Sequence, residues 1–123
     1  MAYTTIKKPS DYFNTKLYSG NGSTQNITGL DFQPDWVWIK ERTSTSDNML
    51  FDAVRGATNR VESNTTDSEA LSPNQLTAFN SDGWTTGNSA GTNESGQTYA
   101  SWNWLANGTG VANTDGSISS TVS

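Results

Sequence analysis

Short segments in which apolar and polar residues alternate follow one another along the chain, separated by clusters of Gly, Asn, Asp and Ser. The clearest strand-like segments span residues 12–18, 36–40, 49–54 and 98–104, and the segments at 36–40 and 49–54 are mainly apolar. Alternation with a period of two is typical of β-strands, and no window carries the apolar spacing of an amphipathic helix. Short strands with turn signals about every 8–12 residues indicate a sandwich or barrel. We therefore predict an all-β fold, an antiparallel β-sandwich.

The most apolar run of the chain lies at residues 36–39. Trp36 and Trp38 would occupy one face of a strand there, and Val37 and Ile39 the other. A strand with two apolar faces is expected in the middle of a sandwich, where both faces are covered.

Residues 98–104 give a second strong strand, with Trp102 and Trp104 on one face and Ser101 and Asn103 on the other. Large aliphatic residues are scarce in this chain, whereas it holds five Trp, four Tyr and four Phe. Each large ring can bury about 150–250 Å². We therefore predict that Trp102, Trp104 and whichever of the earlier pair faces inward form the core.

Turn signals divide the rest of the chain. Residues 12–28 are interpreted as a hairpin or two neighbouring strands around Asn21-Gly22, and residues 76–86 as a hairpin around Asp82-Gly83. Residues 88–97 read as a loop. The predicted organisation is an N-terminal arm at 1–10, a β-sandwich domain at 11–109 and an extended C-terminal tail or linker at 110–123.

The absence of Cys and His narrows the chemistry of the chain. It excludes disulfides, thiolate or imidazole metal ligands and nucleophile pairs that depend on a histidine base. An enzyme would have to use carboxylates, Lys or Tyr. Asp52 lies in an apolar segment near Arg55, and a structural ion pair or turn cap is the preferred interpretation. The Asp and Glu residues of the polar loops do not follow a calcium-loop pattern. We predict no catalytic residues, no metal site and no cofactor.

The charge of the chain argues against nucleic-acid binding, and its hydropathy argues against a membrane-spanning helix. The formal net charge is −5, and the seven Lys and Arg are too scattered to neutralise a row of phosphates. No apolar stretch reaches the roughly 18 residues of a membrane helix. The N-terminus lacks the apolar run of a secretory signal, so we expect synthesis in a cytoplasm without export by a signal peptide.

Several strings stand together in an order typical of one family. They are Ser10–Thr15, Gly20–Gln25, Phe32–Lys40, Val54–Ala57, Asp82–Trp84, Tyr99–Trp104 and Asn113–Ser119. With these strings the chain resembles a domain family of unknown function that occurs in virion and tail-fibre-like proteins of marine tailed phages. The resemblance implies a lectin-like (concanavalin-like) jelly-roll module and a setting on a phage particle, and it carries no catalytic motif.

The first functional hypothesis is a non-enzymatic structural protein on the exterior of the virion, acting as capsid decoration, cement or fibre-base module. It would contact capsid or tail subunits, as a homo-oligomer on the particle. Its polar ends would serve as arms that pair with neighbouring subunits. The residues expected in those contacts are Tyr3, Ile6, Val111, Ile118 and Val122.

The alternative hypothesis is a carbohydrate-binding adhesion module that recognises host surface glycans. Trp84 follows a tight turn and is the ring expected to be most exposed, so Trp84 or a neighbouring Tyr would form the platform, with Asp82 and Asn88 beside it. A carboxylate-based glycosidase is the remaining alternative. The two main hypotheses differ in the apolar surface that they require: attachment predicts terminal arms or a broad sheet face, and glycan binding a small aromatic platform ringed by polar loops.

Overall fold

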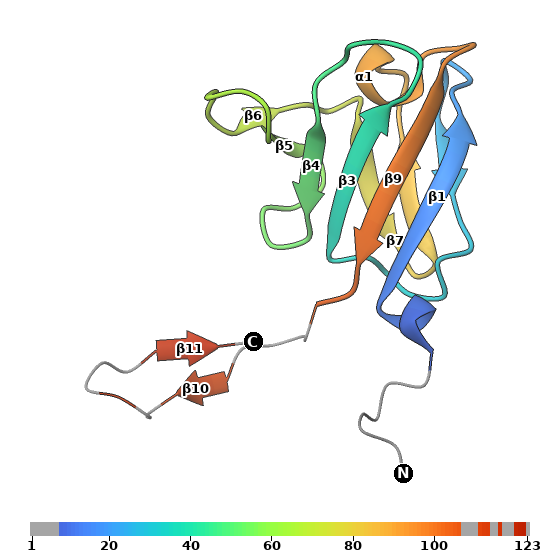
Figure 1. Ribbon diagram of the computed structural model, residues 1–123. Coiled ribbons are helices and arrows are strands. Elements are labelled where there is room, and N and C mark those ends of the chain that lie inside the picture. The colour runs from blue at the N-terminus through green and yellow to red at the C-terminus, as the bar shows by residue number, and fades with distance from the viewer. Residues whose placement is uncertain (1–7, 107–110, 114–115, 117–119, 123) are drawn as a thin grey trace.

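The computed structural model describes residues 8–106, 111–113, 116 and 120–122 (Figure 1). Two short helical turns accompany the strands, η1 (Pro9–Asp11) and α1 (Ala90–Asn93). The strands are β1 (Phe13–Ser19), β2 (Gln25–Ile27), β3 (Trp36–Glu41), β4 (Met49–Asp52), β5 (Asn59–Glu62), β6 (Ala70–Leu71), β7 (Leu76–Asn80), β8 (Gly83–Thr86), β9 (Thr98–Trp104), β10 (Val111–Asn113) and β11 (Ser120–Val122).

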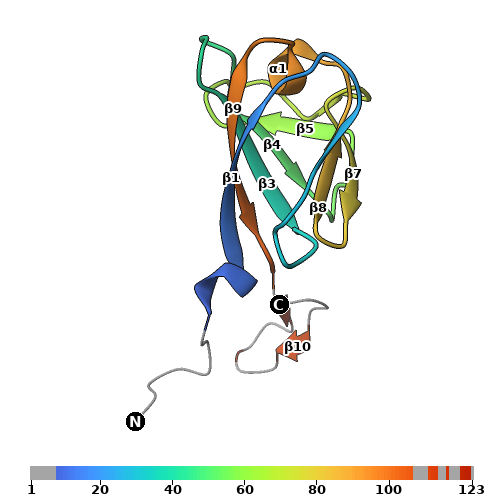
Figure 2. The ribbon, with the colours of Figure 1, turned by 90° about the vertical axis from the view of Figure 1, so that its right-hand side faces the viewer.

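Two antiparallel sheets form a β-sandwich. A six-stranded sheet has the order β1-β9-β3-β4-β5-β6, and a three-stranded sheet has the order β2-β8-β7. Figure 2 shows β1, β9, β3 and β4 on one side and β7 and β8 on the other. The predicted all-β antiparallel sandwich is therefore confirmed.

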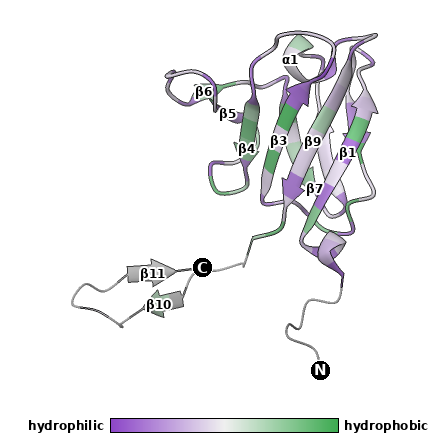
Figure 3. Cartoon of the chain, viewed as in Figure 1, coloured by the Kyte–Doolittle hydropathy of each residue, from purple (hydrophilic) through white to green (hydrophobic). Residues whose placement is uncertain are grey.

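The core lies between the two sheets and is filled from one face of each strand. Val37 and Ile39 of β3 and Phe51 of β4 are fully buried there, and Trp84 of β8 packs from the opposite sheet. Figure 3 shows the hydrophobic colour concentrated in β4 and the middle of β3. The remaining buried apolar residues of this cluster are Ile27, Leu30, Phe32, Met49, Leu76 and Tyr99.

The prediction that the paired tryptophans of β3 and β9 form the core is wrong. On β9 the polar-looking face, with Ser101 and Asn103, turns inward and is fully buried, whereas Trp102 and Trp104 are only partly buried. The three-stranded sheet covers one face of the large sheet, and the inward polar groups find hydrogen-bond partners. Asn103 Oδ1 accepts from the indole N–H of Trp84 at 3.0 Å. Satisfied polar groups can occupy a core that indole rings would otherwise fill.

The two predicted hairpins have different outcomes. Residues 76–86 form the hairpin β7–β8, as expected. Residues 12–28 do not form one, because β1 pairs with β9 in the large sheet and β2 pairs with β8 in the small sheet. The Asn21-Gly22 turn thus joins the two layers of the sandwich.

The loop predicted at residues 88–97 contains the single turn α1 and ties one end of the sandwich together. Asn93 is fully buried, and its Nδ2 donates to the carbonyl oxygens of Ser23 and Gly87, the latter at 2.7 Å. Its Oδ1 accepts from the main-chain N–H of Asn21 at 3.0 Å. The Tyr18 hydroxyl donates to the carbonyl oxygen of Thr92 at 2.7 Å.

The C-terminal segment, which the sequence predicts to be an extended tail or linker, contains two short strands. Its described residues form a separate antiparallel ribbon in which Val111 pairs with Val122 and Asn113 with Ser120.

Candidate functional site

The outer face of the six-stranded sheet carries a row of stacked aromatic rings. Strand register places Phe13 of β1, Trp104 of β9 and Trp36 of β3 side by side. The Trp36 and Trp104 rings are stacked with centroids 4.6 Å apart and planes 24° apart, and Phe13 covers the other side of Trp104 at 5.0 Å. Phe13 and Trp36 each remain 39% exposed.

A second row lies one step along the same strands. Trp38 of β3 and Trp102 of β9 pair in register, with ring centroids 5.5 Å apart. The indole N–H of Trp38 donates to Asn48 Oδ1 at 3.1 Å, which fixes the ring. Leu17 of β1 lies one row further along the sheet, opposite Ala100 of β9, and is 67% exposed. We call this surface the aromatic face, formed by Phe13, Leu17, Trp36, Trp38, Trp102 and Trp104.

The aromatic face is a broad apolar surface rather than a set of scattered side chains. Its residues come from three adjacent strands, β1, β9 and β3, which Figure 1 shows side by side. Contiguous exposed apolar patches of this kind mark interaction sites in soluble proteins, and aromatic residues are enriched at such interfaces. The expectation that both faces of β3 are covered is therefore wrong for the described residues, because no described element covers this face.

The glycan platform predicted around Trp84 does not exist. Trp84 is 0% exposed and its ring packs edge-on against Tyr18, with centroids 5.6 Å apart. Asp82 and Asn88 are exposed, but they lie beyond opposite ends of β8. Tight turns often precede exposed residues, whereas here the small sheet turns the face of β8 that carries Trp84 toward the core.

A groove of about 410 Å³ adjoins the aromatic face at Trp36. One ring face of Trp36 is stacked on Trp104, and Trp36 also lines the groove, on the side of β4. The apolar lining is completed by Leu50, Val54, Val61 and Ala106. Val54 is 98% exposed and stands at the rim.

The polar groups of the groove are two carboxylates and one guanidinium. Asp52 pairs with Arg55, and its Oδ1 also accepts from the main-chain N–H of Arg55 at 2.8 Å. Arg55 Nε lies 3.0 Å from Glu69 Oε2. The hydrogen bond and charge of Asp52, with a smaller contribution from Glu69, raise the pKa of Arg55. The predicted ion pair and turn cap of Asp52 are thus confirmed.

Asp35 is the third charged residue of the groove, and the sequence reasoning did not select it. Its Oδ2 accepts from the main-chain N–H of Ala106 at 2.7 Å, and its own N–H donates to the carbonyl oxygen of Trp104 at 2.8 Å. The feature of the sequence that could have identified Asp35 is its position directly before the Trp36 strand. Its meaning depends on the pairing of β3 with β9, which the sequence does not reveal.

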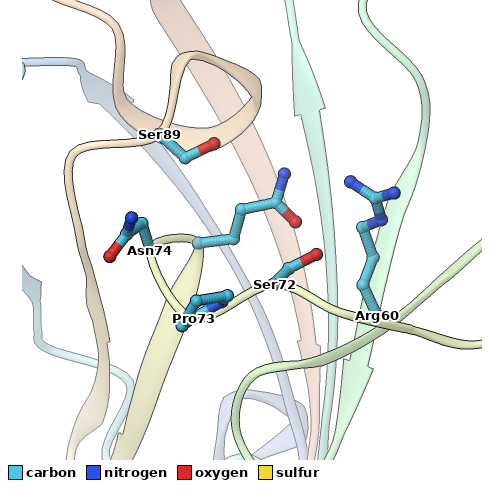
Figure 4. A pocket seen from close by; sticks show the side chains of 6 residues that line it. Arg60, Ser72, Pro73, Asn74 and Ser89 are labelled. Carbon is cyan, nitrogen blue, oxygen red and sulfur yellow. The ribbon is translucent and has the colours of Figure 1, made fainter.

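A second hollow, of about 260 Å³, lies near α1 and has polar walls, shown in Figure 4 with Arg60, Ser72, Asn74 and Ser89. Gln75 also lines it and is 6% exposed. Gln75 Oε1 is buried without a hydrogen-bond partner among the described residues.

The predicted arm residues are only partly within the described chain. Tyr3, Ile6 and Ile118 lie outside the described residues. Val111 and Val122 pair through their main chains in the β10–β11 ribbon. Their role as subunit contacts remains a prediction.

Within the described ranges, no cluster of three or more Asp and Glu side chains is arranged to hold a metal ion. None of the helices found in those ranges has the length and apolar character needed to cross a bilayer.

Fold and surface together define a small β-sandwich domain with an exposed aromatic sheet face. Residues 8–123 match the model of the family described as Domain of unknown function (DUF7483), and the chain belongs to that family. Neither a curated protein nor a solved structure matches the chain.

Proposed function

We propose that this domain is a non-enzymatic attachment module on the exterior of a tailed-phage particle and that it binds a neighbouring virion subunit through its aromatic face. The single observation that supports this proposal is the breadth of that face, which spans three strands and leaves Leu17 67% exposed. Burial of apolar surface drives protein association, and a flat sheet face suits a protein partner.

The carbohydrate-binding alternative required an exposed Trp84 as its aromatic platform, and Trp84 is buried. The rings of the aromatic face pack against one another: Trp104 is stacked on Trp36 and also contacts the tilted ring of Phe13. A sugar ring needs an open aromatic face and several hydrogen-bond partners around it. This arrangement favours a protein partner over a glycan.

The proposal is tested on purified particles of a phage that encodes the chain. Particles are washed until peripheral proteins dissociate, and recombinant protein is added back and quantified after sedimentation. We expect Leu17→Ser to reduce rebinding at least tenfold, since it places a hydroxyl in an apolar contact. The matched control is Leu71→Ser in β6, where the leucine is 72% exposed and lies outside the aromatic face.

If Leu17→Ser and the control Leu71→Ser rebind to the same extent, the contact does not depend on the aromatic face and lies elsewhere on the domain. Purified particles that never contain the chain would contradict a role in the virion. Retention of the chain by particles only after treatment with host polysaccharide would favour glycan recognition instead.

A further inference from the structure

The groove beside Trp36 has the shape and lining of a receptor for one long side chain. Trp36 forms one wall beside its stacking partner Trp104, and Leu50 and Val61 provide an apolar surface next to it. Its volume of about 410 Å³ admits a side chain with a long aliphatic portion. Lys and Arg place their methylene stems along such surfaces while the charged end stays near water or polar groups.

The charges of the groove favour a cation. Asp35 and Asp52 contribute two negative charges to its lining and Arg55 one positive charge. Arg55 is engaged by Asp52 on one side and by Glu69 on the other. Asp35 Oδ2 is used by the N–H of Ala106, and the described residues place no donor on its Oδ1. The groove therefore keeps a net negative charge next to an exposed indole ring, and both attract ammonium or guanidinium groups.

We propose that this groove receives a lysine or arginine side chain from the surface of the protein to which the domain attaches. The inference rests on the proposed function and adds the chemistry of the partner: a basic residue projecting from a protein surface that covers the aromatic face. The net charge of −5 favours the approach of such a partner.

Other occupants fit the groove less well. A pyranose would leave most of its hydroxyl groups against apolar walls, and Asp52 and Arg55 are already bonded to each other. A leucine or phenylalanine side chain would fill the space but would leave Asp35 without a compensating charge.

The test uses small probes that isolate the side-chain chemistry. N-acetyl-lysine-N-methylamide and N-acetyl-arginine-N-methylamide are titrated into ¹⁵N-labelled protein, with the Trp36 indole N–H signal as readout, assigned through Trp36→Phe. The norleucine and citrulline analogues are the neutral counterparts, and methyl glucoside is the sugar probe. We expect saturable shifts from the cationic probes at millimolar concentration and binding of the neutral analogues weaker by about fivefold or more.

A charge-matched pair of variants separates the groove from the general field of the protein. Asp35→Asn keeps an oxygen for the N–H of Ala106 but removes the charge, and we expect it to weaken binding of the lysine probe by about threefold. The control Asp82→Asn removes the same charge from the exposed β7–β8 turn and should leave binding unchanged.

Equal binding of neutral and cationic probes, tighter binding of methyl glucoside, or no shift at Trp36 would each overturn the inference. Those results would leave the proposed function intact, since it is tested separately by Leu17→Ser in the rebinding assay. If Leu17→Ser loses rebinding but the Trp36 signal does not respond to the cationic probes, the domain attaches through its aromatic face without a lysine or arginine in the groove.

Discussion

Asn103 shows how a polar side chain is accommodated in a core where a tryptophan was expected. Its side chain is fully buried on the inner face of β9. Its Oδ1 accepts from the Trp84 indole N–H at 3.0 Å, and its Nδ2 donates to the carbonyl oxygen of Asn14 at 3.1 Å and to Ser101 Oγ at 3.0 Å. One amide thus links β9 to its neighbour β1 and to the opposite sheet, and satisfies the polar end of the largest core ring.

We expect Asn103→Ala to lower the free energy of unfolding by about 2 kcal/mol, because it leaves the Trp84 N–H without a partner in the core. Chemical denaturation followed by tryptophan fluorescence measures this change. The control Asn88→Ala, at an exposed position, should stay within about 0.5 kcal/mol of the parent. A loss below about 1 kcal/mol for Asn103→Ala would mean that this network contributes little.

At the scale of elements, the close contact between β2 and the β7–β8 hairpin depends on one glycine. A Cβ built on Gly83 would lie 1.8 Å from the carbonyl oxygen of Ile27 and 2.9 Å from its carbonyl carbon. Since β2 and β8 are paired at Ile27 and Trp84, a side chain at residue 83 would push the two strands apart. Glycine in a strand often marks such a backbone approach.

Gly83→Ala should therefore destabilise the protein by about 3 kcal/mol, through displacement of β2 from the small sheet. Hydrogen exchange at the β2 amides should accelerate more than exchange in β3. Gly116→Ala is the control, since no atom of the described residues lies within 4 Å of a Cβ there. Unchanged exchange in β2 would contradict this explanation.

At the scale of the whole molecule, the sandwich holds two tyrosines in contact, Tyr18 and Tyr99, with ring centroids 5.1 Å apart. Burial, with a smaller effect of Tyr99, raises the pKa of Tyr18 well above its ordinary value, and burial also raises the pKa of Tyr99. In the unfolded chain a tyrosine loses its proton near pH 10, whereas the folded protein retains it there. The contribution to stability is therefore complete below pH 10 and declines as the pH rises above it.

Above about pH 10 the free energy of unfolding should fall with rising pH, by up to about 1.4 kcal/mol per pH unit for Tyr18. Tyr18→Phe should remove one such slope, while costing about 1 kcal/mol at neutral pH through the lost hydrogen bond to Thr92. Denaturant melts between pH 8 and pH 11 provide the measurement. An unchanged slope in Tyr18→Phe would refute the assignment.

The sequence by itself determined the type and approximate position of most strands. Alternation of side chains marked β1 and β9, short apolar runs marked β3 and β4, and Asp82-Gly83 marked the β7–β8 turn, because side-chain period and turn geometry are local properties. The proximity of Asp52 and Arg55 in sequence was also enough to predict their pairing.

Only the tertiary structure decided which face of each strand is inside. In β3 both faces are apolar, so the local pattern cannot distinguish them. In β9 the face with Tyr99, Ser101 and Asn103 is the inner one, because the opposite sheet supplies a hydrogen-bond partner to that face. The same choice buries Trp84 and places Trp36, Trp38, Trp102 and Trp104 on the outer face of the sheet. The aromatic face and its groove follow from strand pairing and sheet packing, which depend on contacts between residues far apart in the chain.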